Sequence, residues 1–130
     1  MLLFEVHLTP RPQKQTQFSR HGPYDPSYQQ KKEIQWQIKP YAPKEPLKGP
    51  LIVDIMFYLP IPKSTSKTLK TQMLNGIVYP MKRPDLDNLA YIVTNAMKEI
   101  VYEDDAQIVD LNLKKRYGEQ PKTVIKVIEL

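Results

Sequence analysis

The sequence predicts a single α+β domain, built on a mixed sheet of about four strands with helices packed on it. Three observations lead to this prediction. Apolar residues alternate with period two near the start, in the middle and near the end of the chain. In contrast, residues 86–100 repeat apolar positions every three to four residues. A chain of 130 residues can build one hydrophobic core but not two, so we expect one domain over residues 1–130.

The first quarter of the chain predicts a strand, a basic loop and a helix. Residues 2–8 place apolar side chains at alternate positions, which is typical of a half-buried strand. The stretch 11–23 is basic and broken by Pro and Gly, so it predicts a loop. Asp25 and Pro26 are suited to begin a helix, which we expect to end near Lys39.

A second strand should follow this helix. We interpret Tyr28, Ile34 and Ile38 as anchors of the helix, and Trp36 as a packing residue rather than a platform for stacking bases. Residues 51–59 carry apolar side chains on both faces. This pattern predicts a strand that is buried on both sides and central in the sheet.

The second half predicts a basic connection, a helix and a terminal hairpin. Residues 61–84 form a loop or a short helix, where phosphate contact and a solvated linker are both open interpretations of the basic residues Lys63, Lys67, Lys70, Lys82 and Arg83. A helix is expected from its apolar stripe of Leu86, Leu89, Val93, Ala96 and Ile100. Residues 107–117 and 123–130 predict an antiparallel hairpin around the turn GEQPK.

Composition excludes several kinds of chemistry. The chain has no cysteine, so a disulfide, a cysteine zinc site and thiol catalysis are excluded. No apolar run approaches the roughly 20 residues of a membrane span, so we expect a soluble protein without a membrane partner. The net charge of +5 favours an anionic partner. Residues 84–105 hold six acids and one base, a charge of −5 that leaves +10 on the rest of the chain.

The acidic island contains two motifs. In RPDLDN, Asp85 and Asp87 are two residues apart at the start of the predicted helix, where one aspartate is usually a cap but two can serve a cation. An EF-hand is excluded because Ala90 stands where that loop needs Gly. In YEDDAQIVD, a chain returning after the helix could bring Asp104 or Asp105 beside the first pair.

These two motifs resemble the signature of the RusA family of Holliday junction resolvases, most clearly over residues 79–118. The resemblance implies a homodimeric endonuclease that depends on Mg²⁺, with Mn²⁺ as an alternative, and that needs no small-molecule cofactor. It implies metal binding by Asp85, Asp87 and Asp105, with Asp104 as a neighbouring catalytic acid. The implied DNA-binding residues are Gln13, Lys14, Gln15, Thr16, Lys82 and Arg83, and we expect Arg20 and Asn88 to bind DNA with them.

The substrate implied is a four-way DNA junction, cut by paired incisions in recombination and repair in the cytoplasm of a bacterium or a phage-infected cell. One position departs from the family pattern, which commonly has lysine where this chain has Tyr91. Tyrosine cannot supply a fixed positive charge. An alternative is therefore a junction-binding protein impaired in catalysis, and a third interpretation is a domain with an incidental acidic helix face.

Overall fold

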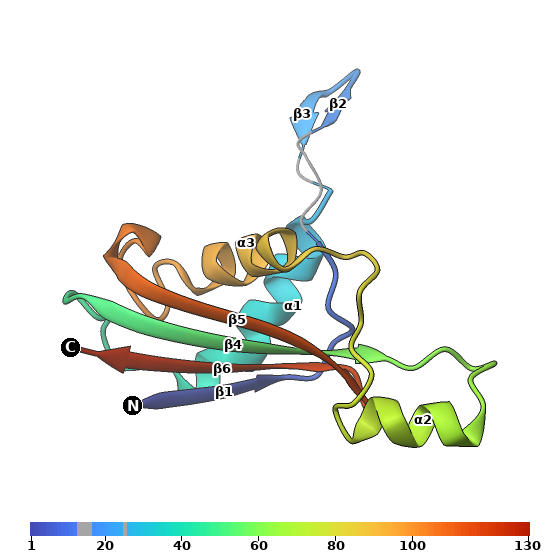
Figure 1. The fold of residues 1–130 in the computed structure, drawn as a ribbon. Helices are drawn as coiled ribbons and strands as arrows, with labels where there is room; N and C mark the ends of the chain where they lie inside the picture. The colour runs from blue at the N-terminus through green and yellow to red at the C-terminus, as the bar shows by residue number, and fades with distance from the viewer. Residues whose placement is uncertain (13–16, 25) are drawn as a thin grey trace.

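The strongly apolar segment 51–60 forms strand β4 (Leu51–Pro60), which lies inside a four-stranded sheet of order β1-β6-β4-β5 (Figure 1). Strand β4 runs antiparallel to β6 and parallel to β5, while β1 is antiparallel to β6. The computed structural model describes residues 1–12, 17–24 and 26–130. The predicted α+β class with a mixed sheet of about four strands is confirmed.

The other strands and helices follow one another along the chain. In order they are β1 (Leu2–Val6), β2 (Gln17–Ser19), β3 (Gly22–Tyr24), α1 (Tyr28–Ile38), α2 (Lys67–Leu74), α3 (Leu86–Met97), β5 (Ile108–Gly118) and β6 (Lys122–Glu129). Short 3-10 helices cover Lys39–Tyr41 and Asp105–Gln107.

The expected terminal hairpin is wrong, although both of its strands exist. Strands β5 and β6 do not pair with each other, because β4 lies between them. The three residues that join them cover four Cα steps, up to about 13 Å of extended chain. Two strand spacings are only about 9.6 Å, so the same short connection can close a hairpin or pass across the end of one intervening strand.

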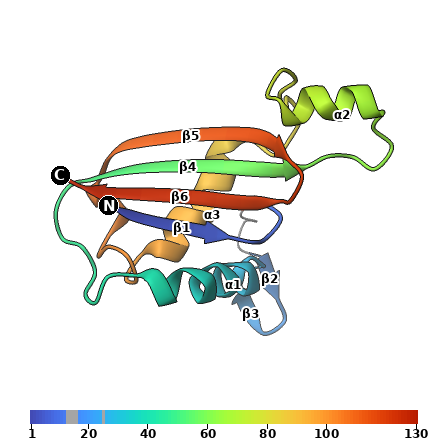
Figure 2. The ribbon, with the colours of Figure 1, turned by 90° about the horizontal axis from the view of Figure 1, so that it is seen from below.

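One face of the sheet is covered by α1 and α3, and the opposite face is open (Figures 1 and 2). In β4 the residues Leu51, Val53, Ile55 and Phe57 are buried toward the helices, while the alternate residues are only half-buried. The expected central position of this strand is confirmed, but burial on both sides is wrong. Helices cover one face alone, so the second face keeps partial contact with solvent.

Helix α3 is the most buried helix because it packs against both the sheet and the neighbouring helix α1. Its predicted stripe is confirmed for Leu89, Val93 and Ala96, whereas the helix ends at Met97 and Ile100 lies beyond it. In α1 the expected anchors Ile34 and Ile38 are buried. The interpretation of Tyr28 and Trp36 as packing residues is wrong, because Tyr28 is 59% and Trp36 is 79% exposed.

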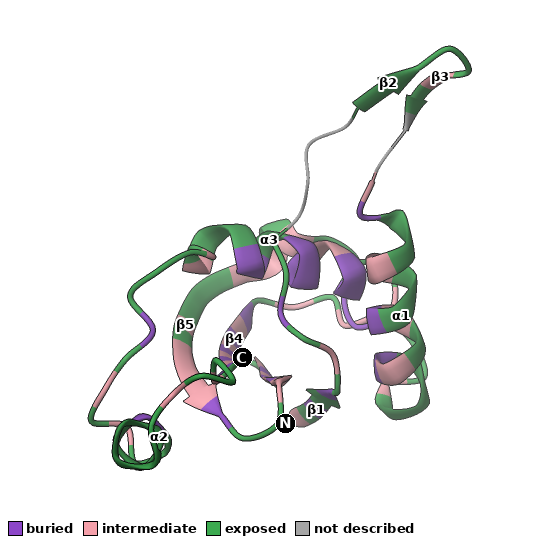
Figure 3. Ribbon diagram, turned by 90° about the vertical axis from the view of Figure 1, so that its right-hand side faces the viewer, coloured by how far each residue is buried: buried purple, intermediate pink, exposed green. Residues whose placement is uncertain are grey.

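Two segments project from the body of the molecule. Strands β2 and β3 form a small hairpin that extends beyond the start of α1, and α2 lies beyond the end of β4 (Figures 1 and 3). The predicted basic loop after the first strand therefore contains a strand pair. Within the described ranges, every helix is too short or too polar to cross a membrane.

Candidate metal and DNA-binding site

Asp85 and Asp87 stand at the start of α3. Asp85 is the N-cap residue, but its side chain accepts no capping hydrogen bond; only its carbonyl oxygen accepts one, from Leu89 N at 3.1 Å. Asp87 lies in the first helical turn, and both side chains are exposed. The positive end of the helix dipole favours two carboxylates here. Capping does not occupy the Asp85 carboxylate, which leaves both acids available to an external cation.

The connection that leads into Asp85 is held by strand β5. Lys115 Nζ donates to Lys82 O at 3.0 Å and to Pro84 O at 3.1 Å. The adjacent Arg116 stacks its guanidinium on the Tyr79 ring at 4.7 Å from the ring centroid. Successive strand residues point to opposite faces of a sheet. Lys115 and Arg116 therefore both contact the segment 79–84, one from each face of this edge strand.

Asp104 and Asp105 lie at the other end of α3. Lys98, the C-cap residue of that helix, has its Nζ 4.0 Å from Asp104 Oδ1. Asp104 also caps the following 3-10 helix, because Oδ1 accepts from Ala106 N at 3.2 Å and Gln107 Oε1 accepts from Asp104 N at 2.8 Å. Asp104 is thus occupied by local structure, whereas Asp105 is half-buried beside it.

The two neighbouring carboxyls have opposite pKa shifts. Hydrogen bonds from Ala106 N and from Asp105, together with the charge of Lys98, lower the pKa of Asp104. The shared hydrogen bond with Asp104, partial burial and the charge of Asp104 raise the pKa of Asp105. Asp105 is therefore the member of the pair that holds its proton more strongly. A nearby cation would favour its ionised form.

The two acidic motifs do not meet within one chain. A helix of 12 residues separates them by about 18 Å along its axis. In the described part of the chain, no three Asp, Glu or His side chains lie close enough together to hold a metal ion. The returning strand β5 brings Lys115, and not Asp105, back to the start of α3.

The expected DNA-binding residues fall on separate elements. Lys82, Arg83 and Asn88 are exposed and flank Asp85 and Asp87 in sequence. Arg20 is exposed in the turn between β2 and β3, on the projecting hairpin (Figure 3). Gln13, Lys14, Gln15 and Thr16 lie outside the described residues.

Tyr91 occupies the position one helical turn after Asp87. Its side chain is 57% exposed, and residues four apart share a helix face. The phenol therefore stands on the same side of α3 as the Asp87 carboxylate. It can donate a hydrogen bond or stack on a base, but it cannot supply a positive charge.

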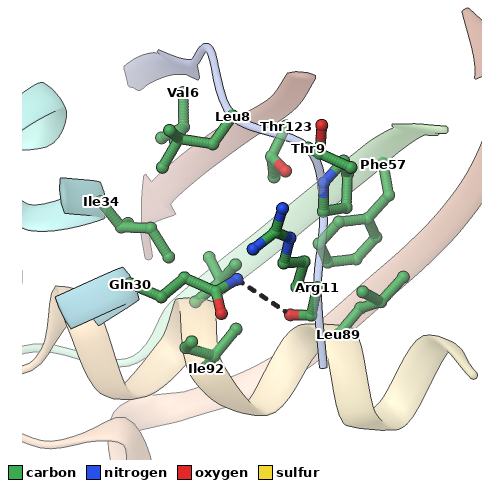
Figure 4. Close-up of a pocket in the computed structure, with 12 residues that line it drawn as sticks. Val6, Leu8, Thr9, Arg11, Gln30, Ile34, Phe57, Leu89, Ile92 and Thr123 are labelled. Carbon is green, nitrogen blue, oxygen red and sulfur yellow. Dashed lines mark hydrogen bonds between the residues drawn. The ribbon is translucent and has the colours of Figure 1, made fainter. Parts of the chain in front are cut away.

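A joint between β1, α1 and α3 supports the base of the projecting hairpin (Figure 4). Gln30 Nε2 donates to Arg11 O at 3.2 Å, and apolar side chains including Leu89 and Ile92 line the small space beside it. The cavity measures about 10 Å³, which is room for about one water molecule. We interpret it as a structural joint that fixes where the chain leaves the body toward the hairpin.

An exposed acidic pair, with basic residues close by in sequence at one end of a buried helix, can hold a divalent cation beside a phosphate backbone. The sequence model of the family described as Endodeoxyribonuclease RusA matches residues 7–128. The chain therefore belongs to the RusA endodeoxyribonuclease family, which confirms the resemblance noted in its two motifs.

A curated protein of Bacillus subtilis (strain 168) is also similar to this chain. It is described as uncharacterized protein YqaN and is 35% identical over 92 residues. The match covers 69% of this chain and 65% of the relative, so the chain spans about two thirds of the length of the curated protein it matches.

Lys115 and Arg116 are contacts of the site that the motifs did not reveal. A signal for Lys115 was nevertheless present in the alternation of β5. Lys115 lies opposite the buried Phe57, on the side of the strand that faces the helices. A lysine on the core side of a strand needs a polar partner nearby, and here the partners are two backbone carbonyls.

Proposed function

We propose that this protein is a Mg²⁺-dependent endonuclease that cuts four-way DNA junctions by paired incisions, as a homodimer, in recombination and repair. The observation that carries the proposal is the Asp85 carboxylate, which caps nothing although it stands at a helix start. A side chain with a capping role at this position would accept a hydrogen bond from a backbone N–H of the first helical turn. An unengaged carboxylate beside a second one is suited to a ligand.

The chemistry of the donors fits a hard divalent cation. Mg²⁺ is bound in proteins through one or two carboxylates and keeps several of its waters. Asp85 and Asp87 have no side-chain partner among the described residues, so neither must give up a bond to accept a metal. When bound, such an ion supplies an activated water and stabilises the leaving oxygen.

A third acid must come from a second subunit if Asp105 takes part. Within one chain Asp105 lies beyond the far end of α3, a helix about 18 Å long that starts next to Asp85. In a two-fold symmetric dimer, one surface meets its own copy, so a contact made once is made twice. The partner subunit's Asp105 would then complete one site, while Asp105 of this chain completes the other. Paired sites match the two incisions that a junction requires.

Exposed apolar side chains support association with a second copy. Leu74, Ile77, Tyr79 and Met81 lie in and after the projecting α2, and Met81 is 91% exposed. The open face of the sheet adds half-buried apolar residues such as Met56 and Val124. Contiguous exposed apolar surface commonly marks an interface.

Basic residues of the chain would hold the DNA. Lys82 and Arg83 are placed to neutralise phosphates beside the acidic pair, and Arg20 extends the basic surface onto the projecting hairpin. Such contacts position the backbone without reading the base sequence. Junction shape is then the main recognition element.

Catalytic impairment is the second candidate, and Tyr91 is the observation that favours it. Losing one preorganised positive group or donor at a reacting oxygen costs about 10²–10³ in rate. In this alternative the chain binds junctions and does not cut them. Junction binding alone therefore does not distinguish the two proposals.

The deciding experiment is a nicking assay on a synthetic four-way junction in Mg²⁺, with binding measured separately in Ca²⁺. We expect the wild type and Glu119→Gln to cut, and Asp87→Asn to bind without cutting. Glu119→Gln is the matched control, because Glu119 is an exposed acid in the turn before β6. Equal cutting by Asp87→Asn and wild type would overturn the acidic site. Binding without cutting by the wild type would instead favour the impaired binder.

A further inference from the structure

The ammonium group of Lys115 donates hydrogen bonds to two backbone carbonyls. This residue lies on the edge strand β5, in register with Phe57 of β4, and is half-buried. Two of its three N–H groups donate to the carbonyl oxygens of Lys82 and Pro84. Bonds from a charged donor are roughly twice as strong as neutral ones, so this contact restrains the segment firmly.

The two carbonyls that Lys115 binds flank Arg83, and the second precedes Asp85. Fixing both peptide groups sets the direction in which the Arg83 side chain leaves the chain. It also sets the backbone from which the Asp85 carboxylate projects. On the other face of β5, Arg116 stacks on Tyr79 and its Nη1 donates to Lys115 O at 2.8 Å. The connection into α3 is therefore held where it crosses the edge of the sheet.

We propose that Lys115 is the positioning residue of the acidic site and the fixed cation at this end of α3. It acts through the carbonyls of Lys82 and Pro84, and so keeps Asp85 in a conformation that leaves its carboxylate free. The Lys115 ammonium group lies on β5, beside the connection that leads into the acidic pair. It thus places a positive charge near the start of α3, the helix in which Tyr91 takes the position of the family lysine. This inference rests on the proposed function.

The absence of cysteine allows a clean chemical test. In Lys115→Cys the new thiol is the only one in the chain. Alkylation with 2-bromoethylamine rebuilds a lysine-like ammonium, whereas iodoacetamide adds a neutral amide of similar size. The matched control is Lys114→Cys treated in the same two ways, because Lys114 is exposed and points to the opposite, open face of the sheet.

Three readouts separate positioning from a general effect on folding. Mn²⁺ binding without DNA is followed by the electron paramagnetic resonance of the free ion, junction binding is measured in Ca²⁺, and cleavage in Mg²⁺. Outer-shell partners of a metal site typically contribute about 10–100-fold to metal affinity or activity. We expect Lys115→Cys to lose about that factor in Mn²⁺ affinity and in cleavage. Its junction binding should match that of Lys114→Cys.

Aminoethylation of Lys115→Cys should restore Mn²⁺ affinity and cleavage, and the neutral amide should not. Equal behaviour of the Lys115 and Lys114 series would overturn the inference, as would equal rescue by both reagents. If Lys115→Cys does not fold, Lys115→Gln is used in its place. The positioning role is then measured by amide hydrogen exchange of residues 82–89 and by Mn²⁺ affinity, both of which we expect to change. Unchanged exchange and Mn²⁺ affinity in that variant would also overturn the inference.

The outcomes keep the two proposals distinct. A wild type that binds Mn²⁺ but cuts no junction would contradict the proposed function. The Mn²⁺ affinities of the Lys115 and Lys114 variants would still decide the role of Lys115. A wild type that binds no Mn²⁺ overturns the positioning role together with the metal site.

Discussion

The hydroxyl of Tyr102 donates a hydrogen bond to the carbonyl oxygen of Thr94 across 2.6 Å. The last four carbonyl groups of a helix have no hydrogen-bond donor within the helix, and the Tyr102 hydroxyl supplies a donor to one of the four in α3. Gln35 Nε2 donates to Ala96 O, and backbone N–H groups donate to the carbonyls of Asn95 and Met97. The helix end is therefore fully satisfied, and the segment carrying Asp104 and Asp105 is fastened to it.

Removing this hydroxyl should destabilise the fold without emptying the core. Tyr102 is fully buried, so Tyr102→Phe leaves Thr94 O buried without that donor, at a cost of about 1–3 kcal/mol. The free energy of unfolding in urea measures this loss, and an unchanged m-value would show that the denatured state is unaffected. An unchanged midpoint would contradict the role assigned to the hydroxyl.

Asp105→Asn should raise stability near neutral pH and have no such effect in acid. The pKa of Asp105 is raised above its ordinary 3.8 in the folded protein. The folded state therefore binds this proton more tightly, and stability falls as pH rises from about 3.8 through the raised pKa. The asparagine variant escapes that loss.

Thermal unfolding with EDTA, at pH 7 and at pH 3, measures this difference. We expect a higher Tm for Asp105→Asn than for wild type at pH 7 only. The pKa of Asp104 is lowered, so its contribution has the opposite sign: it is present above the ordinary pKa and is lost as pH falls. Asp104→Asn should accordingly lower the Tm at pH 7. A higher Tm for Asp105→Asn at both pH values would refute the electrostatic cause.

Local pattern predicted the elements of the fold well, because each pattern depends on one face of one element. The stripe of α3 and the alternation of β4 are both of this kind. Pairing was harder to predict, since Gly118 and Lys122 could end a hairpin or flank an intervening strand equally well. The exposed Trp36 shows the same limit, because an aromatic residue in a helix does not reveal which face is covered.

The acidic site was predicted in part for a related reason. Asp85 and Asp87 share one helix end, so their proximity follows from sequence spacing. The position of Asp105 depends on where the chain turns after α3, and it turns at the far end of the helix. Lys115 is distant in sequence from Pro84, and only the return of β5 along the helix side brings the two together.

Tyr91→Lys distinguishes the two functional proposals. If Lys115 already provides the fixed cation, adding a second one should change junction cleavage by no more than a few-fold. If the chain is impaired by the tyrosine, cleavage should rise by on the order of 100-fold, the usual worth of one stabilising group. Single-turnover rates in Mg²⁺ measure the change. Junction affinity in Ca²⁺ serves as the control for altered binding.

Lys82→Ala should weaken junction binding and its salt dependence, because one phosphate is no longer neutralised by the protein. Each neutralised phosphate contributes about 0.9 to the slope of log K against log salt on duplex DNA. Lys82 is exposed beside the acidic pair, so we expect the slope to fall by about one.

The matched control is Lys44→Ala, which removes the same charge from an exposed position in the connection between α1 and β4. This connection contacts the segment after α3 through Leu47 and Val101, far from Asp85. Fluorescence anisotropy of a labelled junction across a salt series gives both slopes. The same loss in both variants would mean that Lys82 acts only through net charge, and that the DNA does not follow the start of α3.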